Sequence, residues 1–177
     1  MPSYEELVIG ADENFTGKRT ILLPVDISET AYKAVVWATK HVINPETDNV
    51  VLVHCREVLY PLINLLVGNS EYRNGMKAAS KEDIAKFEAE SKQLSHAVLA
   101  RCSSALTKLG IHVKGVSIVG DARQTLIEYI QNHKPDLVVM ASQGKSALRA
   151  AYIGSVSTYL IHHSTSAVAI IPRELLE

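Results

Sequence analysis

The chain alternates between short apolar runs and longer stretches in which apolar residues recur every three or four positions. The short runs are rich in Val, Ile and Leu, which is typical of strands buried on both faces of a parallel sheet. The longer stretches have the period of amphipathic helices. Five runs are expected to be strands, at residues 20–26, 50–55, 113–119, 137–140 and 167–171.

Four helices are expected between and beside these strands. Ser28 is a suitable N-cap for the first helix, and Gly110 a suitable residue to close the long helix over 81–109. A further helix follows the Gly120-Asp121 turn, and the last begins at Ser155. The long helix is expected to bury one face, formed by Ile84, Phe87, Ser91, Leu94, Val98, Cys102, Ala105 and Leu109.

Strands that alternate with helices predict an α/β fold with a parallel, doubly wound sheet. Ligands of such sheets bind beyond the carboxyl ends of the strands, where the strand order reverses. Asp26 and the loop at 141–144 both follow strands, so we expect them to meet there. Residues 1–18 have no sustained period and are expected to form an N-terminal extension, with one domain over 19–177. Residues 57–80 are expected to form a loop or lid that carries a short helix.

Composition and charge exclude several classes of function. The net charge is −1 and no long basic run is present, so no nucleic-acid partner is expected. No apolar stretch approaches the roughly 18 residues of a membrane span, so no membrane partner is expected. The chain has 2 cysteines, which provide no disulfide framework. Together with the lack of a signal-peptide pattern, this favours a cytoplasmic protein.

The candidate chemistry lies between residues 136 and 156. Gly144 is followed, after nine intervening residues, by Gly154 and Ser155 at the expected start of the last helix. A helix start offers free N–H groups and partial positive charge to a phosphate. Alternatively, Gly144 only makes a turn and Ser155 only caps its helix. A P-loop is excluded because Val139 stands where that motif needs glycine, and a nucleophile elbow because no acid and histidine follow in the required order.

The ordered set of motifs resembles the universal stress protein family, in particular its ATP-binding branch. It comprises Pro24-Val25-Asp26, the valine–histidine pair of the second strand, Gly120-Asp121, and the segment from Ala141 through Gly144 to Gly154-Ser155. The resemblance spans Lys18 to Pro172. It implies a five-stranded parallel sheet of order 3-2-1-4-5, of the adenine nucleotide alpha hydrolase-like or Rossmann-like type. It also implies bound ATP or AMP, with Mg²⁺ possible beside ATP, and homodimers paired through Ala167, Val168, Ala169, Ile170 and Ile171.

The resemblance also implies roles for individual residues. The base and ribose would be lined by the end of the first strand, adenine would pack on the second strand, and the ribose and phosphates would lie against the last loop and helix. Asp26 could instead act only as an N-terminal helix cap. The nucleotide-binding set comprises Pro24, Val25, Asp26, Val53, Met140, Ala141, Gln143, Gly144, Gly154, Ser155 and Val156.

These residues lead to one principal function and two alternatives. The principal function is an adenine-nucleotide-binding sensor or regulator of the stress response that works through a nucleotide-dependent dimer. Ala141 stands where the family pattern has glycine, so the alternative is a dimeric interaction module with a pocket that no longer binds. The second alternative is a slow ATP hydrolase that uses Asp26 as a base. No residue pattern predicts an efficient enzyme.

Overall fold

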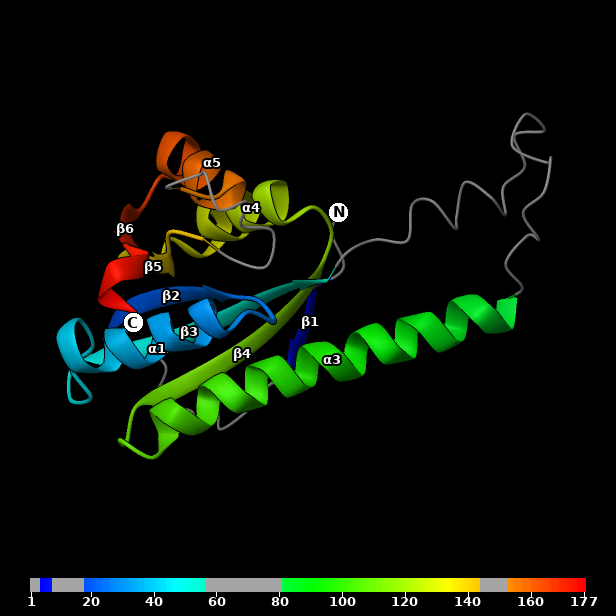
Figure 1. Ribbon diagram of the computed structural model, residues 1–177, viewed down its shortest axis with the longest axis horizontal. Helices are drawn as coiled ribbons and strands as arrows, with labels where there is room; N and C mark the ends of the chain where they lie inside the picture. Colours follow the sequence, from blue (N-terminus) through cyan, green and yellow to red (C-terminus); the bar gives the residue numbers. More distant parts are fainter. Residues whose placement is uncertain (1–3, 8–17, 57–80, 144–152) are drawn as a thin grey trace.

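The central feature is a twisted sheet with helices on both faces, described by a computed structural model for residues 4–7, 18–56, 81–143 and 153–177 (Figure 1). Its strands run in the order β1-β4-β3-β2-β5-β6. The elements are β1 (Tyr4–Leu7), β2 (Arg19–Val25), α1 (Glu29–His41), β3 (Asp48–Arg56), α3 (Lys81–Thr107), β4 (His112–Val119), α4 (Ala122–His133), β5 (Leu137–Ala141), α5 (Ser155–His163), β6 (Ala167–Ile171) and the 3₁₀ turn η2 (Arg173–Leu175).

The five predicted strands form the parallel part of the sheet, and their predicted order 3-2-1-4-5 is confirmed as β4-β3-β2-β5-β6. The structure adds β1, which pairs antiparallel with β4 at the edge of the sheet. No strand is predicted within residues 1–18 from the sequence, because four residues are too few to show an alternation. The predicted loop or lid at 57–80 lies outside the described residues.

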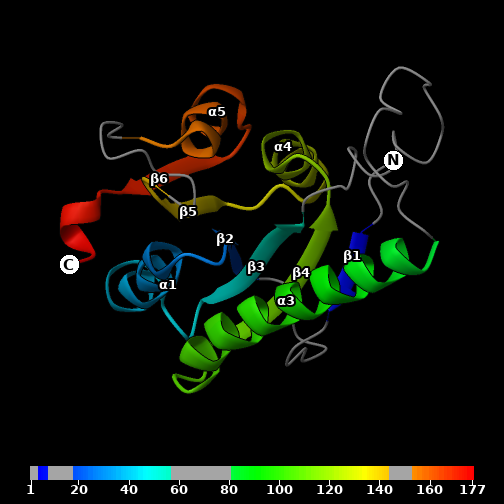
Figure 2. The same cartoon turned by 45° about the vertical axis from the view of Figure 1, so that its right-hand side comes forward.

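The two faces of the sheet carry two separate hydrophobic clusters, because successive side chains of a strand point to opposite faces. The cluster under α1 and α3 includes Ile21, Leu52 and Leu99. The cluster under α4 and α5 includes Leu22, Val51, Ile130 and Leu160. Figure 2 shows the two pairs of helices on opposite sides of the strands. Both faces of the strands are therefore buried, as their near-continuous apolar sequences predict.

The predicted apolar face of α3 is wrong in its first half. Phe87 and Leu94 are 41% and 51% exposed, and Leu109, just past the helix end, is exposed as well. The side that packs on the sheet instead includes Ser95, Leu99 and Leu106. Figure 1 shows why: the N-terminal half of α3 projects beyond the strands, so the described part of the sheet does not reach its apolar residues. Among the helices of the described ranges, none is long and apolar enough to cross a membrane.

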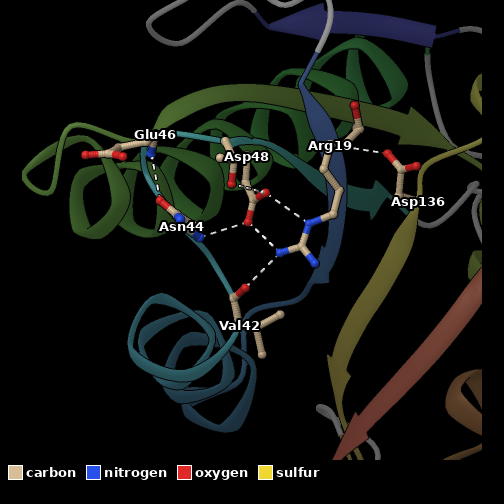
Figure 3. Close-up of polar contacts among 8 residues, drawn as sticks. Arg19, Val42, Asn44, Glu46, Asp48 and Asp136 are labelled. Atoms are coloured by element: carbon tan, nitrogen blue, oxygen red, sulfur yellow. Dashed lines mark hydrogen bonds and ion pairs between the residues drawn. The ribbon is translucent and has the colours of Figure 1, made fainter.

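The amino ends of β2 and β3 are held together by a partly buried ion pair between Arg19 and Asp48 (Figure 3). Arg19 donates from Nε to Asp48 Oδ1 at 2.9 Å and from Nη2 to Asp48 Oδ2 at 2.6 Å. The same Nη2 also donates to the carbonyl oxygen of Val42, at the end of α1, at 2.9 Å. The backbone N–H of Asn44 donates to Asp48 Oδ2 at 2.8 Å. These hydrogen bonds hold the amino ends of β2 and β3 together. The strands separate instead at the carboxyl end of the sheet.

Candidate functional site

Strands β2 and β5 separate toward their carboxyl ends, at the point where the strand order reverses. They pair only at Ile21–Leu137 and Leu22–Val138. The carbonyl oxygen of Thr20 faces β5, because it accepts a hydrogen bond from the N–H of Asp136 at 2.9 Å. Backbone groups alternate in direction along a strand, so the nitrogen of residue 24 faces β5 too. Residue 24 is Pro24 and has no N–H to continue the ladder. The strands therefore diverge where a parallel α/β sheet binds ligands.

A cavity of about 680 Å³ lies beyond these diverging ends. Its walls come from the ends of β2, β3 and β5, the starts of α4 and α5, and the projecting half of α3. All of the predicted site residues that the structure describes line this one cavity, whereas Gly144 lies outside the described residues. The lining members of the predicted set are Pro24, Val25, Asp26, Val53, Met140, Ala141, Gln143, Gly154, Ser155 and Val156.

Asp26 supports the start of α1 indirectly. Ser28 is the N-cap, as predicted, and its Oγ accepts a hydrogen bond from the N–H of Ala31 at 3.1 Å. Asp26 Oδ1 in turn accepts from the N–H of Ser28 at 2.9 Å and from the Ser28 hydroxyl. The carboxylate of Asp26 thus orients the capping residue while it lines the cavity. The alternative prediction, in which Asp26 itself is the N-cap of this helix, is therefore wrong.

The start of α5 is fixed against the end of β5 by short backbone contacts. The N–H of Gly154 donates to the carbonyl oxygen of Ser142 at 2.6 Å. Ser157 Oγ donates to the carbonyl oxygens of Ala141 and Ser142 at 3.2 and 3.3 Å. Gly154 is the N-cap of α5 and provides no side-chain cap. The first residues of this helix line the cavity, and Gly154 has no side chain to cap their N–H groups, which is a favourable arrangement for an anion.

Ala141, which replaces a glycine of the family pattern, has an ordinary strand conformation. The residue is the last of β5 and is 7% exposed. It belongs to the hydrophobic cluster under α1 and α3, with Val25 and Ile171. Positive φ among the described non-glycine residues occurs only at Lys134. The backbone at position 141 therefore does not need the conformational freedom of glycine.

The predicted site set includes Val53 of β3 but no other residue of β3, and none of α3 or α4, that lines the cavity. His54 and Arg56 line it from β3, Glu90 and Leu94 from α3, and Arg123 from α4. These residues belong to three elements far apart in the chain, so only the fold brings them together. Ser157 was missed too, although a small polar residue one turn into a helix that follows a buried strand was a usable signal.

The ionisable groups at the start of α4 form a local pair. Hydrogen bonds from Arg123, at 3.1 Å to Asp121 Oδ2 and by its backbone N–H, lower the pKa of Asp121, although partial burial opposes them. Asp121 is the N-cap of α4 and also accepts from the N–H of Gln124. The Asp121 carboxylate therefore remains ionised, and it accepts hydrogen bonds from the start of its own helix, α4.

Neither a reactive thiol nor a metal cluster is found in the described part of the site. Burial raises the pKa of Cys55 to about 11, despite its contact with Thr125 Oγ1 at 3.4 Å, so the thiol is neutral. Across residues 4–7, 18–56, 81–143 and 153–177, no group of three or more His, Cys, Asp or Glu could hold a metal ion.

Comparison with protein families finds one match that covers most of the chain. Residues 18–172 match the model of the universal stress protein family. Universal stress protein MJ0577 of Methanocaldococcus jannaschii is 27% identical over 163 residues, which cover 88% of this chain and 96% of that protein. Universal stress protein PHOS32 of Arabidopsis thaliana is 32% identical over 167 residues, which cover 87% of this chain and 64% of that protein.

Solved structures of low sequence identity share the fold. The structure of MJ0577 aligns with a TM-score of 0.68 at 21% identity and covers 86% of this chain and 94% of its own. An Arabidopsis thaliana universal stress protein family protein with AMP bound aligns with a TM-score of 0.60 at 17% identity, over 86% and 90% of the two chains. The match over residues 18–172, together with this shared fold, shows that the chain belongs to the universal stress protein family.

Proposed function

We propose that the protein binds an adenine nucleotide, ATP or AMP, in the cavity at the carboxyl ends of β2 and β5. The observation that carries this proposal is the convergence of Asp26, Gln143 and the start of α5, whose N-cap is Gly154, on one cavity at the reversal of strand order. Family members crystallised with nucleotides support it: one from Arabidopsis thaliana with AMP, one with cAMP, and one from Archaeoglobus fulgidus with dAMP.

In this proposal the phosphates lie at the start of α5 and the nucleoside extends over β2 toward β3. Gly154, Ser155 and Val156 offer backbone N–H groups to the phosphates. Pro24, Val25 and Asp26 line the ribose and base, and Val53 lies beneath the base. Met140, Ala141 and Gln143 border the ribose and phosphates. A Mg²⁺ ion would accompany ATP mainly through phosphate oxygens and water.

Burial of Ala141 favours binding over an empty pocket. Its methyl group packs in the cluster under α1 and α3, and the strand conformation is one that alanine adopts without strain. Ala141→Gly is expected to change nucleotide affinity little, as measured by titration calorimetry. A strong gain of affinity from an undetectable starting value would instead favour the interaction-module alternative.

The proposal is tested by titration calorimetry with ATP and AMP, for which we expect micromolar-range dissociation constants. Ser155→Asp places a negative charge at the start of α5, where it stabilises the helix but repels a phosphate. We expect this variant to lose at least tenfold in affinity while its melting temperature holds or rises. Ser104→Asp, on the exposed side of α3 and outside the cavity, is the matched control. Absence of binding heat for the unmodified protein at millimolar nucleotide would refute the proposal.

We infer a regulatory role in the stress response, through a nucleotide-dependent dimer in the cytoplasm, rather than efficient catalysis. Cys55 and Cys102 are both free, which accords with a reducing compartment. The Asp26 carboxylate is engaged by Ser28 at the start of α1, which argues against its use as a general base. Sustained nucleotide turnover abolished by Asp26→Asn would overturn this inference.

A further inference from the structure

The first half of α3 carries large apolar side chains that the sheet does not bury. Phe87 and Leu94 are 41% and 51% exposed, and Ile27, two residues past the end of β2, is 52% exposed. All three line the cavity at the carboxyl ends of the strands. Exposed apolar side chains that are scattered singly need no explanation, but a group of them at one cavity indicates a site for an apolar part of a ligand.

Hydrogen bonds show which residue of α3 lies level with the ends of the strands. His54 Nδ1 of β3 lies 2.9 Å from Ser95 Oγ of α3, and Ser95 Oγ is hydrogen-bonded to Ser117 Oγ of β4 at 2.8 Å. Because α3 connects two parallel strands, it runs antiparallel to both. From Ser95 to Phe87 the helix rises about 12 Å. Strand β3 extends only about 7 Å beyond His54. Phe87 therefore lies about 5 Å beyond the end of β3, on the part of α3 that projects past the strands (Figure 1).

Phe87, Ser91 and Leu94 share one face of α3, because residues four and seven positions apart lie on the same side of a helix. All three line the cavity, so this face is turned toward it, with Glu90 beside it. The small side chain of Ser91 leaves space between the two large apolar ones. Together with Ile27, this face forms an apolar wall that rises past the ends of the strands.

The cavity changes in polarity between α5 and α3. On the side of α5 it is lined by Gln143 and by Gly154 and Ser155 at the start of the helix, whereas the apolar wall lies on the side of α3. Strand β2 separates β3 from β5, so at about 4.8 Å between neighbouring strands β3 and β5 are about 10 Å apart. A mononucleotide with its phosphate at α5 spans this separation, and its least polar part, the face of the base, then reaches the apolar wall.

We propose that the base of the bound nucleotide packs flat against the ring of Phe87, with Ile27 and Leu94 at its edges. The base is then held between α3 and the ends of the strands. Phe87 acts as a specificity-determining residue, because it favours ligands that carry a planar aromatic ring. The inference rests on the proposed function, since it names the residues that recognise the base of the same nucleotide.

The first test measures the dissociation constant of AMP by titration calorimetry. Phe87→Ala should weaken AMP binding by about tenfold, within the range for stacking of a base on an aromatic side chain. Phe87→Tyr, which keeps the aromatic face, should change the affinity by less than about threefold.

Leu109→Ala is the matched control. Leu109 is a large apolar residue just past the end of the same helix, 53% exposed, and it does not line the cavity. This variant removes a similar exposed apolar surface, so it should leave the affinity for AMP unchanged.

Nuclear magnetic resonance gives a second readout, which a purely structural role of Phe87 would not produce. The chain has 2 phenylalanines, Phe15 and Phe87, so selective labelling of phenylalanine gives two ring spin systems, and Phe87→Tyr assigns them. In the complex with AMP we expect nuclear Overhauser effects between the ring protons of Phe87 and H2 or H8 of the adenine.

The outcomes separate the two proposals. If AMP does not bind, the proposed function itself fails. If AMP binds but Phe87→Ala leaves its affinity unchanged, or Leu109→Ala lowers the affinity as much, the role of Phe87 fails and the proposed function stands. A complex without Overhauser effects between Phe87 and the adenine would also overturn the role of Phe87.

Discussion

Asp48 carries an ionised carboxylate at the amino end of β3 with a side chain only 1% exposed (Figure 3). Burial by itself would raise the pKa of Asp48. The hydrogen bonds from Arg19, from the N–H of Asn44 and from Thr47 outweigh that effect, so the pKa lies below its ordinary value of 3.8. The side chain of Arg19 is itself 44% exposed. The Arg19–Asp48 pair therefore stabilises the amino ends of β2 and β3 and leaves no buried charge unpaired there.

Asp48→Asn is expected to lower the free energy of unfolding at pH 7 by about 2 kcal/mol, the range for losing hydrogen bonds to a charged group. Because the folded-state pKa is lowered, this contribution is present above the unfolded-state value near 4 and is lost as the pH falls through the folded-state pKa. The difference between the two proteins should therefore shrink below about pH 4. Urea denaturation at pH 7 and pH 3 measures it.

Glu29→Gln is the control for that experiment. Glu29 pairs with Arg101 at 2.6 Å, but the two side chains are 60% and 50% exposed, so the loss should stay below about 1 kcal/mol. A difference between Asp48→Asn and the unmodified protein that is equal at both pH values would contradict the argument.

At the scale of elements, the connection from β4 to α4 depends on Gly120. Its φ of +153° is a conformation that side chains rarely adopt, and its N–H donates to the carbonyl oxygen of Arg56 at 2.9 Å. A Cβ at this position would lie 2.3 Å from Cγ2 of Thr125. Thr125 cannot move aside easily, because it is buried and its Oγ1 donates to the carbonyl oxygen of Asp121 at 2.8 Å. The start of α4 therefore packs directly against the turn that follows β4.

Gly120→Ala should cost about 3 kcal/mol of stability, since it adds a steric overlap to backbone strain. Gly110→Ala is the matched comparison: φ is +73° there, and no atom lies within 4 Å of the added Cβ. This variant should cost only the strain, about 1 kcal/mol. Chemical denaturation of both variants checks the prediction, and equal losses would show that the contact with Thr125 is unimportant.

At the scale of the whole molecule, the two edge strands of the described sheet are β1 and β6. The carbonyl oxygen of Ile171 faces β5, because it accepts from the N–H of Ser142 at 2.9 Å. By alternation, the backbone groups of Ala167 and Ala169 also face β5, whereas those of Val168 and Ile170 face the outer edge. An edge with outward N–H and C=O groups is a template for pairing with a second chain. This is the strand through which we expect the dimer to form.

Val168→Pro should convert the expected dimer to a monomer, because proline removes an outward N–H and leaves the ladder to β5 in place. Sedimentation velocity over a range of concentrations measures the change. Ala169→Pro is the contrasting variant: it removes an N–H that faces β5 and should lower the stability of the fold by about 3 kcal/mol. A dimer that survives Val168→Pro, or an unmodified protein that stays monomeric at high concentration, would exclude pairing through β6.

The sequence predicted the elements well where a run of apolar residues or a capping residue marks them. The strand over 167–171 has the bounds that the pattern indicated, and Ser28 caps α1 as expected, whereas the long helix ends at Thr107 and not at Leu109. It failed on the first half of α3, because a periodic apolar face says nothing about whether another layer reaches it. It did not indicate the contact between His54 and Ser95, since a buried hydrogen-bonded pair 41 positions apart leaves no local signal.

The sequence by itself determined the alternation of strands and helices, the strand order through its family resemblance, and the residues at the carboxyl ends of β2 and β5. The alternation and the residues at the strand ends follow from local composition, in which apolar runs, caps and a proline each act on their own neighbours. Only the tertiary structure decided that these ends form one cavity with α3 and α4, that the methyl of Ala141 is buried in the core, and that His54 is held by Ser95 and Ser117. Such contacts join residues from separate elements, so they exist only after the sheet has been assembled.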